Sequence, residues 1–386
     1  SYGQMFNAPD SQIMDRQTLI DLSYNHPLAE DSAVSGRLYM GWYDYVGDYI
    51  NDLNAPLSPP LPATYAVLAD GRWLGAELRY VAPRSGRHKW LLGADYQLNL
   101  RQDQWNHYVG SPNDFEARER NHDTWGLLVH DEITLTDDLS LQLGVRLDRP
   151  VTGGNEVHPR LGLSYHWSDA ITLKLLYGSA FRAPNAYERY YYGVNPNLVP
   201  EDISTHEFVL EHHFTRNSLL SATLFQYRVN DLINFTSVQQ LENLGSARAK
   251  GIELQQDTRL RNGGRLTASY SWQLAESSDG RWLGNSPRHM AKISLHQPLF
   301  STNWQAGLEM QYFGPRRNQG GTIVGGYTLA NLNLLNRRIA RDLEFSLRVS
   351  NLFDKSYADP AAIDFAPLDR VTQDGREWVA RLESQF

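Results

Sequence analysis

The feature that most constrains the fold is a two-residue alternation of apolar and polar side chains that recurs along the whole chain. In the segment DLSLQLGVRLD, residues 138–148, the odd positions from 139 to 147 are all aliphatic, whereas the even positions hold Asp, Ser, Gln, Gly and Arg. Successive side chains of a β-strand point to opposite faces of its sheet. The pattern therefore predicts a strand with one apolar and one polar face.

This alternation predicts an all-β fold with about seventeen strands and no long helix. The clearest strands are expected at residues 90–100, 139–147, 266–274, 304–312 and 343–349. Weaker copies are expected near residues 16–25, 36–46, 73–82, 124–135, 159–167, 171–181, 205–214, 219–229, 248–260, 288–298, 326–335 and 376–386.

Composition excludes several classes of function. A net charge of -8 and a pI near 5.8, without a basic cluster interleaved with aromatic residues, argue against nucleic acid as a partner. Cysteine is absent, which excludes disulfides and thiolate sites. The chain contains no run of 18 apolar residues, so no membrane-spanning helix is predicted. The first residues show no signal peptide.

The connections between the predicted strands alternate between tight turns and long loops. Turns such as TDD at 136–138 and STN at 301–303 alternate with long segments such as 101–122, 182–204, 230–247, 313–325 and 353–375. Outer-membrane barrels have short turns at one end and long loops at the other, and aromatic girdles at both water boundaries. We therefore expect an antiparallel transmembrane β-barrel whose apolar face meets lipid and whose polar face lines a wet interior.

Two carboxylates on the expected lipid-facing side do not fit a simple apolar face. Asp44 follows Leu38, Met40 and Trp42, and Asp131 follows a similar apolar series. A charge near the middle of the bilayer costs about 2–4 kcal/mol for Arg or Lys and less for Asp or Glu. We expect a bulge or an interfacial depth at both positions.

Several motifs resemble the TonB-dependent outer-membrane receptor family. They are FRAP at 181–184, NPNL at 195–198 with Pro-Glu at 200–201, ARAKGIEL at 247–254, RVSNLFDKSYADP at 348–360, and a last strand that ends in Phe386. The resemblance implies a barrel of 22 strands around an N-terminal plug, which imports ferric siderophores, haem or cobalamin with energy from the TonB complex. It also implies a monomer in the outer membrane of a Gram-negative bacterium, surrounded by lipid, and not an enzyme.

The strand count bears on completeness. An odd number of visible strands, with no plug and no TonB box, leads us to expect that residues 1–386 are an N-terminally incomplete barrel domain that lacks about five early strands. A fragment or a truncated gene explains this better than a naturally reduced barrel. Contact with TonB would then require the missing N-terminal part.

Three groups of side chains are candidate ligand-binding residues. Aromatic faces and guanidinium groups can hold an anionic iron chelate by stacking and charge-assisted hydrogen bonds. The alternative is that the aromatic residues form the upper girdle or pack loops together. The candidates are Arg182, Tyr187, Arg189, Tyr190, Tyr191 and Tyr192; Trp105, His107 and Tyr108; and Tyr312, Arg316 and Arg317.

The ligand expected from these candidates is a small iron chelate, a ferric siderophore. Haem is the weaker candidate because residues 185–194 contain no histidine. The charged side chains expected on the polar face are explained as the wall against which a plug docks, and not as an acid–base site. No catalytic residues, resident metal or cofactor are therefore predicted. A plugless passive channel, a receptor for haem or cobalamin, and a soluble all-β binding protein stay open as alternatives.

Overall fold

A computed structural model describes residues 5, 8–28, 31–54, 59–111, 116–118, 120–190, 195, 197–235, 240–299, 303–318, 320–340, 343–361 and 368–384. The described residues are nearly all β, and their one helix is α1 (Ala186–Tyr190). No helix among them is long and apolar enough to cross a bilayer. Phe386, where the last strand is predicted to end, lies outside the described residues.

Among the described residues, eighteen strands belong to one antiparallel sheet, namely seventeen long strands and the three-residue β5 (Glu116–Arg118). The prediction of about seventeen strands is therefore confirmed. The long strands are β1 (Gln12–Pro27), β2 (Ala33–Asp52), β3 (Pro62–Val81), β4 (His88–Tyr108), β6 (His122–Thr134), β7 (Leu139–Arg149), β8 (Glu156–Ser168), β9 (Ile171–Arg182), β10 (Glu201–Thr215), β11 (Ser218–Asn230), β14 (Ala247–Arg259), β15 (Arg265–Ser277), β16 (His289–Leu299), β17 (Trp304–Phe313), β20 (Tyr327–Ala340), β21 (Leu343–Ser350) and β24 (Glu377–Ser384).

In the parts of the long connections that the structure describes, there are three short hairpins. They pair β12 (Ile233–Phe235) with β13 (Leu241–Asn243), β18 (Arg316–Arg317) with β19 (Ile323–Val324), and β22 (Ala358–Pro360) with β23 (Arg370–Thr372). Sequence periodicity did not predict them, because two or three residues are too few to show an alternation.

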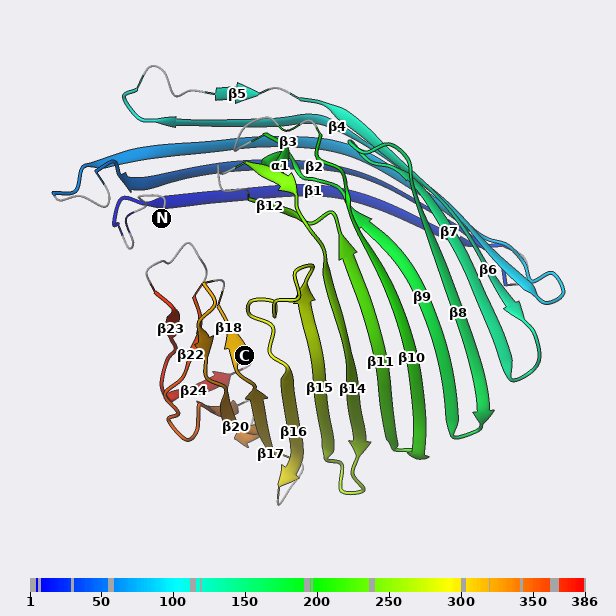
Figure 1. Ribbon diagram of the computed structural model, residues 1–386. Helices are drawn as coiled ribbons and strands as arrows, with labels where there is room; N and C mark the ends of the chain where they lie inside the picture. Colours follow the sequence, from blue (N-terminus) through cyan, green and yellow to red (C-terminus); the bar gives the residue numbers. More distant parts are fainter. Residues whose placement is uncertain are drawn as a thin grey trace. The chain divides into compact units, whose positions relative to one another are not determined.

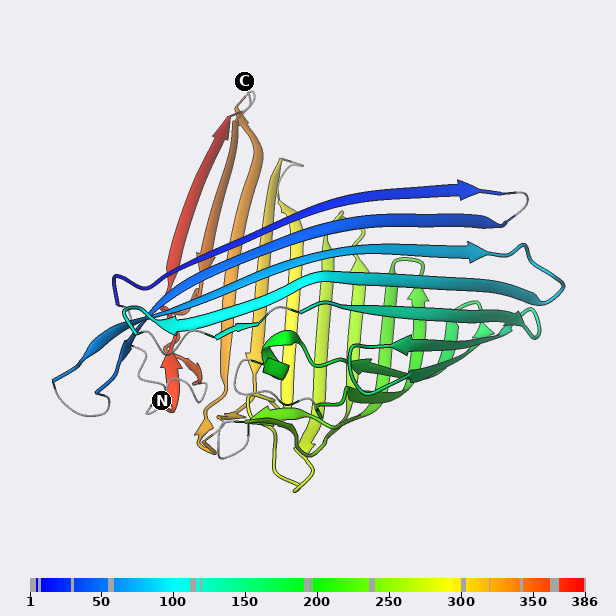
Figure 2. The same ribbon diagram turned by 90° about the horizontal axis from the view of Figure 1, so that it is seen from above.

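The chain divides into two compact units. The first comprises Ser1–Gly162, Gly178–Ser204 and Val229–Gly245, and the second comprises Leu163–Tyr177, Thr205–Arg228 and Ser246–Phe386. In the first unit β1, β2, β3, β4, β6 and β7 pair in this order, and Figure 2 shows β1 to β4 side by side as long blue and cyan ribbons. In the second unit β14, β15, β16, β17, β20, β21 and β24 pair in order, and several of them are labelled in Figure 1.

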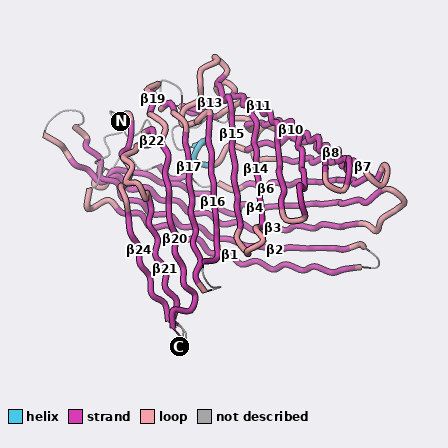
Figure 3. Tube along the Cα trace, turned by 90° about the horizontal axis from the view of Figure 1, so that it is seen from below, coloured by secondary structure: helices cyan, strands magenta, loops and turns pink. Residues whose placement is uncertain are grey.

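Three strands of the first unit are longer than the sequence predicts. β2, β3 and β4 have 20, 20 and 21 residues, and β4 continues to Tyr108 through a segment predicted to be a loop. The added part of β4, residues 101–108, is polar or aromatic on both faces, so it lacks the apolar alternation on which the prediction depended. The segment predicted as the loop 182–204 contains α1 and the start of β10, and Figure 3 shows this helix in cyan.

The opening segment, β7, has the two faces that its sequence predicts. Leu143 and Val145 are 40% and 43% exposed, and Val145 pairs with Val129 of β6. On the opposite face Arg146 binds Asp95 and Asp148, as described below. We call these two surfaces of the first unit the apolar face and the polar face.

The apolar face of β4 runs from Trp90 to Leu100. Ten residue steps of about 3.4 Å span roughly 34 Å along the strand, and a tilt of about 45° reduces this to roughly 24 Å, close to the apolar band of a membrane barrel. Asp131 marks one end of this band, since it pairs with Trp90 in the sheet. It is 5% exposed and contacts His88 over 2.6 Å between Oδ2 and Nδ1.

Asp44 marks the other end of the apolar band. It belongs to a charged row that crosses four neighbouring strands in register, in the order Arg16, Asp44, Asp70 and Asp103. Arg101 binds both Asp70, with Nη1 and Oδ2 2.8 Å apart, and Asp103. Both exceptions noted in the sequence therefore lie at boundaries of the band and not at its centre.

Candidate functional site

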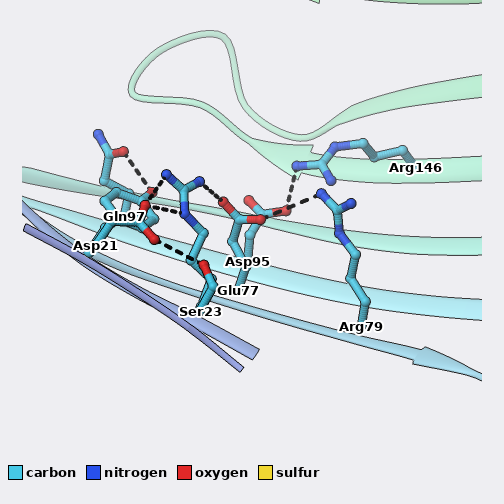
Figure 4. A network of polar contacts seen from close by, with 9 residues as sticks. Asp21, Ser23, Glu77, Arg79, Asp95, Gln97 and Arg146 are labelled. Carbon is cyan, nitrogen blue, oxygen red and sulfur yellow. Dashed lines mark hydrogen bonds and ion pairs between the residues drawn. The ribbon is translucent and has the colours of Figure 1, made fainter. Parts of the chain in front are cut away.

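A row of charged side chains crosses the polar face of the first unit (Figure 4). The guanidinium of Arg37 donates to Asp21 (2.6 Å, Nε to Oδ2) and to Glu77 (2.9 Å, Nη1 to Oε1). Farther along the row, Arg146 Nη2 lies 2.8 Å from Asp95 Oδ1. Each of these arginines is thus paired with carboxylates of the same wall, so this wall is polar and internally neutralised.

Beyond this row the polar face is aromatic. We define the tyrosine wall as Tyr43, Tyr45 and Tyr49 of β2, Tyr65 of β3 and Tyr108 of β4. These positions share one face because the register between β2 and β3 is unbroken and Tyr65 pairs with both Tyr49 and Tyr108. The rings of Tyr65 and Tyr108 lie 4.9 Å apart, and the hydroxyls of Tyr45 and Tyr49 are in contact.

Two arginines lie against one aromatic ring beside β4. The Cζ of Arg120 is 3.6 Å from the ring centroid of Tyr190 in α1, and that of Arg189 is 4.6 Å from it. Arg120 is held on β4, where its Nη1 donates to the carbonyl of Gln102 (3.4 Å) and its own carbonyl accepts from the Gln102 amide (3.0 Å). We call Arg120, Arg189 and Tyr190 the Tyr190 cluster.

The FRAP and NPNL motifs support loops in this structure. Arg182 binds Glu201 (2.7 Å) and Glu188 (2.8 Å), so its charge is matched by two carboxylates. Asn195 donates to the carbonyl of Leu241 (2.8 Å), and Leu198 is 1% exposed. These contacts tie the segment after β9 to the β12–β13 hairpin.

A β-bulge precedes the second group of candidates in β4. Arg72 pairs with Arg101 and Trp73 pairs with Asn99, so Leu100 is an additional residue in β4. Beyond the bulge, Trp105 and His107 share the face of Asp44, Asp70 and Asp103, whereas Tyr108 joins the tyrosine wall on the polar face and accepts a hydrogen bond from Asn51 (3.1 Å). The structure therefore does not bring these three side chains together.

The third group is also divided. Tyr312 shares a strand face with the exposed Leu308 and Met310 of β17. Arg316 is 8% exposed and binds Asp359, and its Nη1 lies 3.2 Å from Asn285 Oδ1. Arg317 lies beside it in β18.

Arg316 belongs to an interlocked set of loops in the second unit. Tyr327 donates to the same Asp359 (2.9 Å), and its ring lies 4.6 Å from that of Tyr357. Burial, followed by the charges of Asp359 and Asp374, raises the pKa of the Tyr357 phenol. This set joins the loops after β15, β17 and β21.

Of the other candidates, Tyr187 is exposed in α1, while Tyr191 and Tyr192 lie outside the described residues. Arg120 was missed by sequence reasoning because it belongs to a segment predicted as an irregular loop. No group of three His, Asp or Glu side chains among the described residues is arranged to hold a metal ion.

A turn outside the sheet shows a further ionic contact. Asp31, between β1 and β2, accepts from Lys89 Nζ (2.8 Å) and from the amide of Arg84 (3.1 Å). These hydrogen bonds hold the pKa of Asp31 below its ordinary value of 3.8. The contact joins two neighbouring turns at one end of the first unit.

Comparison with known proteins decides the family. Residues 2–352 match the model of the TonB dependent receptor-like β-barrel. This chain belongs to the TonB-dependent receptor family. As a TonB-dependent receptor it is a protein of the Gram-negative outer membrane, so its apolar face meets lipid.

The relatives of this TonB-dependent receptor differ in their ligands. The vitamin B12 transporter BtuB of Vibrio cholerae is 28% identical over 230 residues, covering 56% of this chain and 36% of BtuB. The ferric-pyoverdine BN7/BN8 receptor of Pseudomonas putida is 26% identical over 273 residues, covering 61% of this chain and 32% of that receptor. The chain thus spans about a third of the length of these relatives.

Solved structures share the fold. The pyoverdine outer membrane receptor FpvA of Pseudomonas aeruginosa PAO1 matches with a TM-score of 0.78 at 15% identity, covering 97% of this chain and 62% of that one. The copper transporter OprC matches with a TM-score of 0.76 at 20% identity, covering 96% and 65%.

Proposed function

We propose that this receptor takes up a ferric siderophore. The observation that carries the proposal is the composition of the polar face of the first unit, where the tyrosine wall leads to the Tyr190 cluster. Aromatic faces can stack on planar chelating groups, and guanidinium groups can bind their oxyanions. The similarity to ferric-pyoverdine receptors supports the same ligand class.

In this proposal the energy for import comes from TonB. Contact with TonB would require an N-terminal part of the receptor in addition to the barrel residues described above. The receptor is proposed to act as a monomer, and residues 1–386 contribute barrel wall and loops. Relatives are named as transporters and receptors, in agreement with a function in uptake and not in catalysis.

Uptake by whole cells tests the proposal. A strain with the complete gene and a deletion strain are grown under iron limitation and given radioiron as siderophore complexes, radiolabelled cobalamin, haem or copper. We expect gene-dependent uptake of a ferric siderophore that stops when TonB is inactivated. Gene-dependent uptake of cobalamin, haem or copper alone would show that the ligand class is wrong, and TonB-independent flux of all solutes would indicate a passive channel.

A further inference from the structure

The Tyr190 cluster differs from the sites of Arg37, Arg146 and Arg182 in the charge balance around one of its arginines, Arg189. Arg37, Arg146 and Arg182 each contact two carboxylates. Arg189, in contrast, forms no ion pair within the described part of the chain, and its buried Nε has no hydrogen-bond acceptor there. Because the Arg189 guanidinium has no counter-ion among the described residues, its position is one of positive potential.

The arrangement of the cluster keeps the two cations together. Both Arg120 and Arg189 lie against the same ring of Tyr190, whose π face partly offsets their mutual repulsion. The Gln102 carbonyl orients Arg120, and Asn185 holds the backbone of Arg189 at the start of α1. The cations are therefore fixed before any ligand arrives, which lowers the entropic cost of binding an anion.

The surroundings of the cluster indicate what kind of anion it accepts. Gln102 is on the polar face of β4, six residues before Tyr108 of the tyrosine wall. A ligand that contacts both elements needs an oxyanion at one side and flat, hydroxyl-bearing or aromatic groups at the other.

Resting on the proposed function, we propose that Arg189 and Arg120 form the oxyanion site of this receptor, and that the receptor selects negatively charged chelates over neutral ones. Arg189 supplies the unpaired charge, Arg120 supplies a second positively charged donor group, and Tyr190 holds the two in place. Arg37 and Arg146 on the polar face do not contribute to binding of the anion, because carboxylates already neutralise their charges.

Binding to the purified complete receptor in detergent tests this inference. The probes are an anionic ferric catecholate complex, neutral ferric acetohydroxamate and inorganic phosphate as a competitor, with intrinsic tryptophan fluorescence as the readout. We expect the catecholate complex to bind at least about tenfold more tightly than the neutral complex, and phosphate to compete with it. Arg189→Gln and Arg120→Gln should each weaken catecholate binding about tenfold and leave the neutral complex unaffected.

Two variants serve as controls. Arg189→Lys keeps the charge and should retain more affinity than Arg189→Gln. Arg281→Gln removes an exposed arginine that pairs with Asp279 in a loop of the second unit, and it should change nothing. Unaltered near-ultraviolet circular dichroism would show that each variant is folded.

The outcomes separate the two proposals. Equal affinity for both iron complexes, with no effect of either Gln variant, would overturn the oxyanion site and leave the siderophore receptor in place. If neither iron complex binds but phosphate binds in a manner that depends on Arg189, the oxyanion site stands and the siderophore proposal fails. If none of the three probes binds, both are wrong.

Discussion

The guanidinium of Arg146 on β7 reaches past β6 to Asp95 on β4, with Nη2 and Oδ1 2.8 Å apart. It can do so because the β6 residue in register with Asp95 is Gly126. A Cβ atom at Gly126 would lie 2.7 Å from Arg146 Cζ. The absence of one side chain thus permits an ion pair between strands that are not neighbours.

Replacing this glycine should break the ion pair. We expect Gly126→Ala to lower the free energy of unfolding by about 1–3 kcal/mol, because Arg146 must move away from both Asp95 and Asp148. Urea unfolding in detergent micelles measures the change. Gly307→Ala is the matched control, since its Cβ would meet only the side chain of Asn333, at an ordinary 3.6 Å from Cβ and 3.9 Å from Nδ2. Equal losses in both variants would contradict the explanation.

Aromatic rings cover glycines elsewhere on the polar face. The phenol of Tyr39 lies over Gly75, its partner in β3, and donates to Gln97 Oε1 (3.0 Å). Gly75→Ala should cost about 1–3 kcal/mol of unfolding free energy. In a double-mutant cycle the same substitution should cost little when residue 39 is already Ala, whereas additive losses would show that the ring and the glycine are not coupled.

Lipid contact can be tested with two positions on one strand. Leu147→Arg places a charge near the middle of the apolar band, since Leu147 pairs with Leu127 and Leu127 with Ala94, and should destabilise the protein in lipid vesicles by about 2–4 kcal/mol. Gln142→Arg places the same charge on the polar face and should cost much less. If the two costs are equal, or in the reverse order, the assignment of the faces is wrong.

The pair of His88 and Asp131 should matter because the carboxylate is buried at the edge of the apolar band. His88→Ala leaves Asp131 without its partner, at a cost of about 1–3 kcal/mol. Adding Asp131→Leu should recover most of the loss, as measured by unfolding in vesicles. No recovery would mean that His88 acts through its stacking on Trp90 instead, with ring centroids 6.0 Å apart.

The Asp31 turn should open in acid. Because the folded-state pKa of Asp31 is lowered, its contribution to stability is present above the ordinary value of 3.8 and is lost as the pH falls through the folded pKa. Hydrogen exchange of the Leu28 amide, which donates to the Ser32 carbonyl in this turn, should rise in that range after correction for intrinsic rates. In Asp31→Asn, exchange should be faster at neutral pH and lose this extra acid dependence; an unchanged profile would contradict the role of Asp31.

The strands and their faces were predictable because lipid imposes a strict alternation, as in Leu143, Val145 and Leu147 of β7. The prediction weakened where the strands leave the apolar band. Because residues 101–122 are expected to form a loop, Trp105, His107 and Tyr108 are grouped together, although alternation within β4 places Tyr108 on the opposite face from Trp105 and His107.

The site was only partly predictable for a similar reason. Arg189 and Tyr190 were identified from composition, but their neighbour Arg120 is distant in sequence and comes close only through its contacts with Gln102. Arg182 was chosen for its charge, whereas pairing with Glu188 and Glu201 depends on loop geometry that no local pattern encodes.

Because Leu100 is an additional residue in β4, its loss would change which face of the sheet the following side chains occupy. Deleting its codon would exchange the faces of every later side chain in the strand, so Trp105 and His107 would turn inwards and Tyr108 outwards, while the part of β4 within the hydrocarbon kept its orientation. A single in-frame deletion could thus give this receptor a different inner surface without a single amino-acid substitution. Natural variation in ligand preference should therefore be sought in strand length as well as in residue identity.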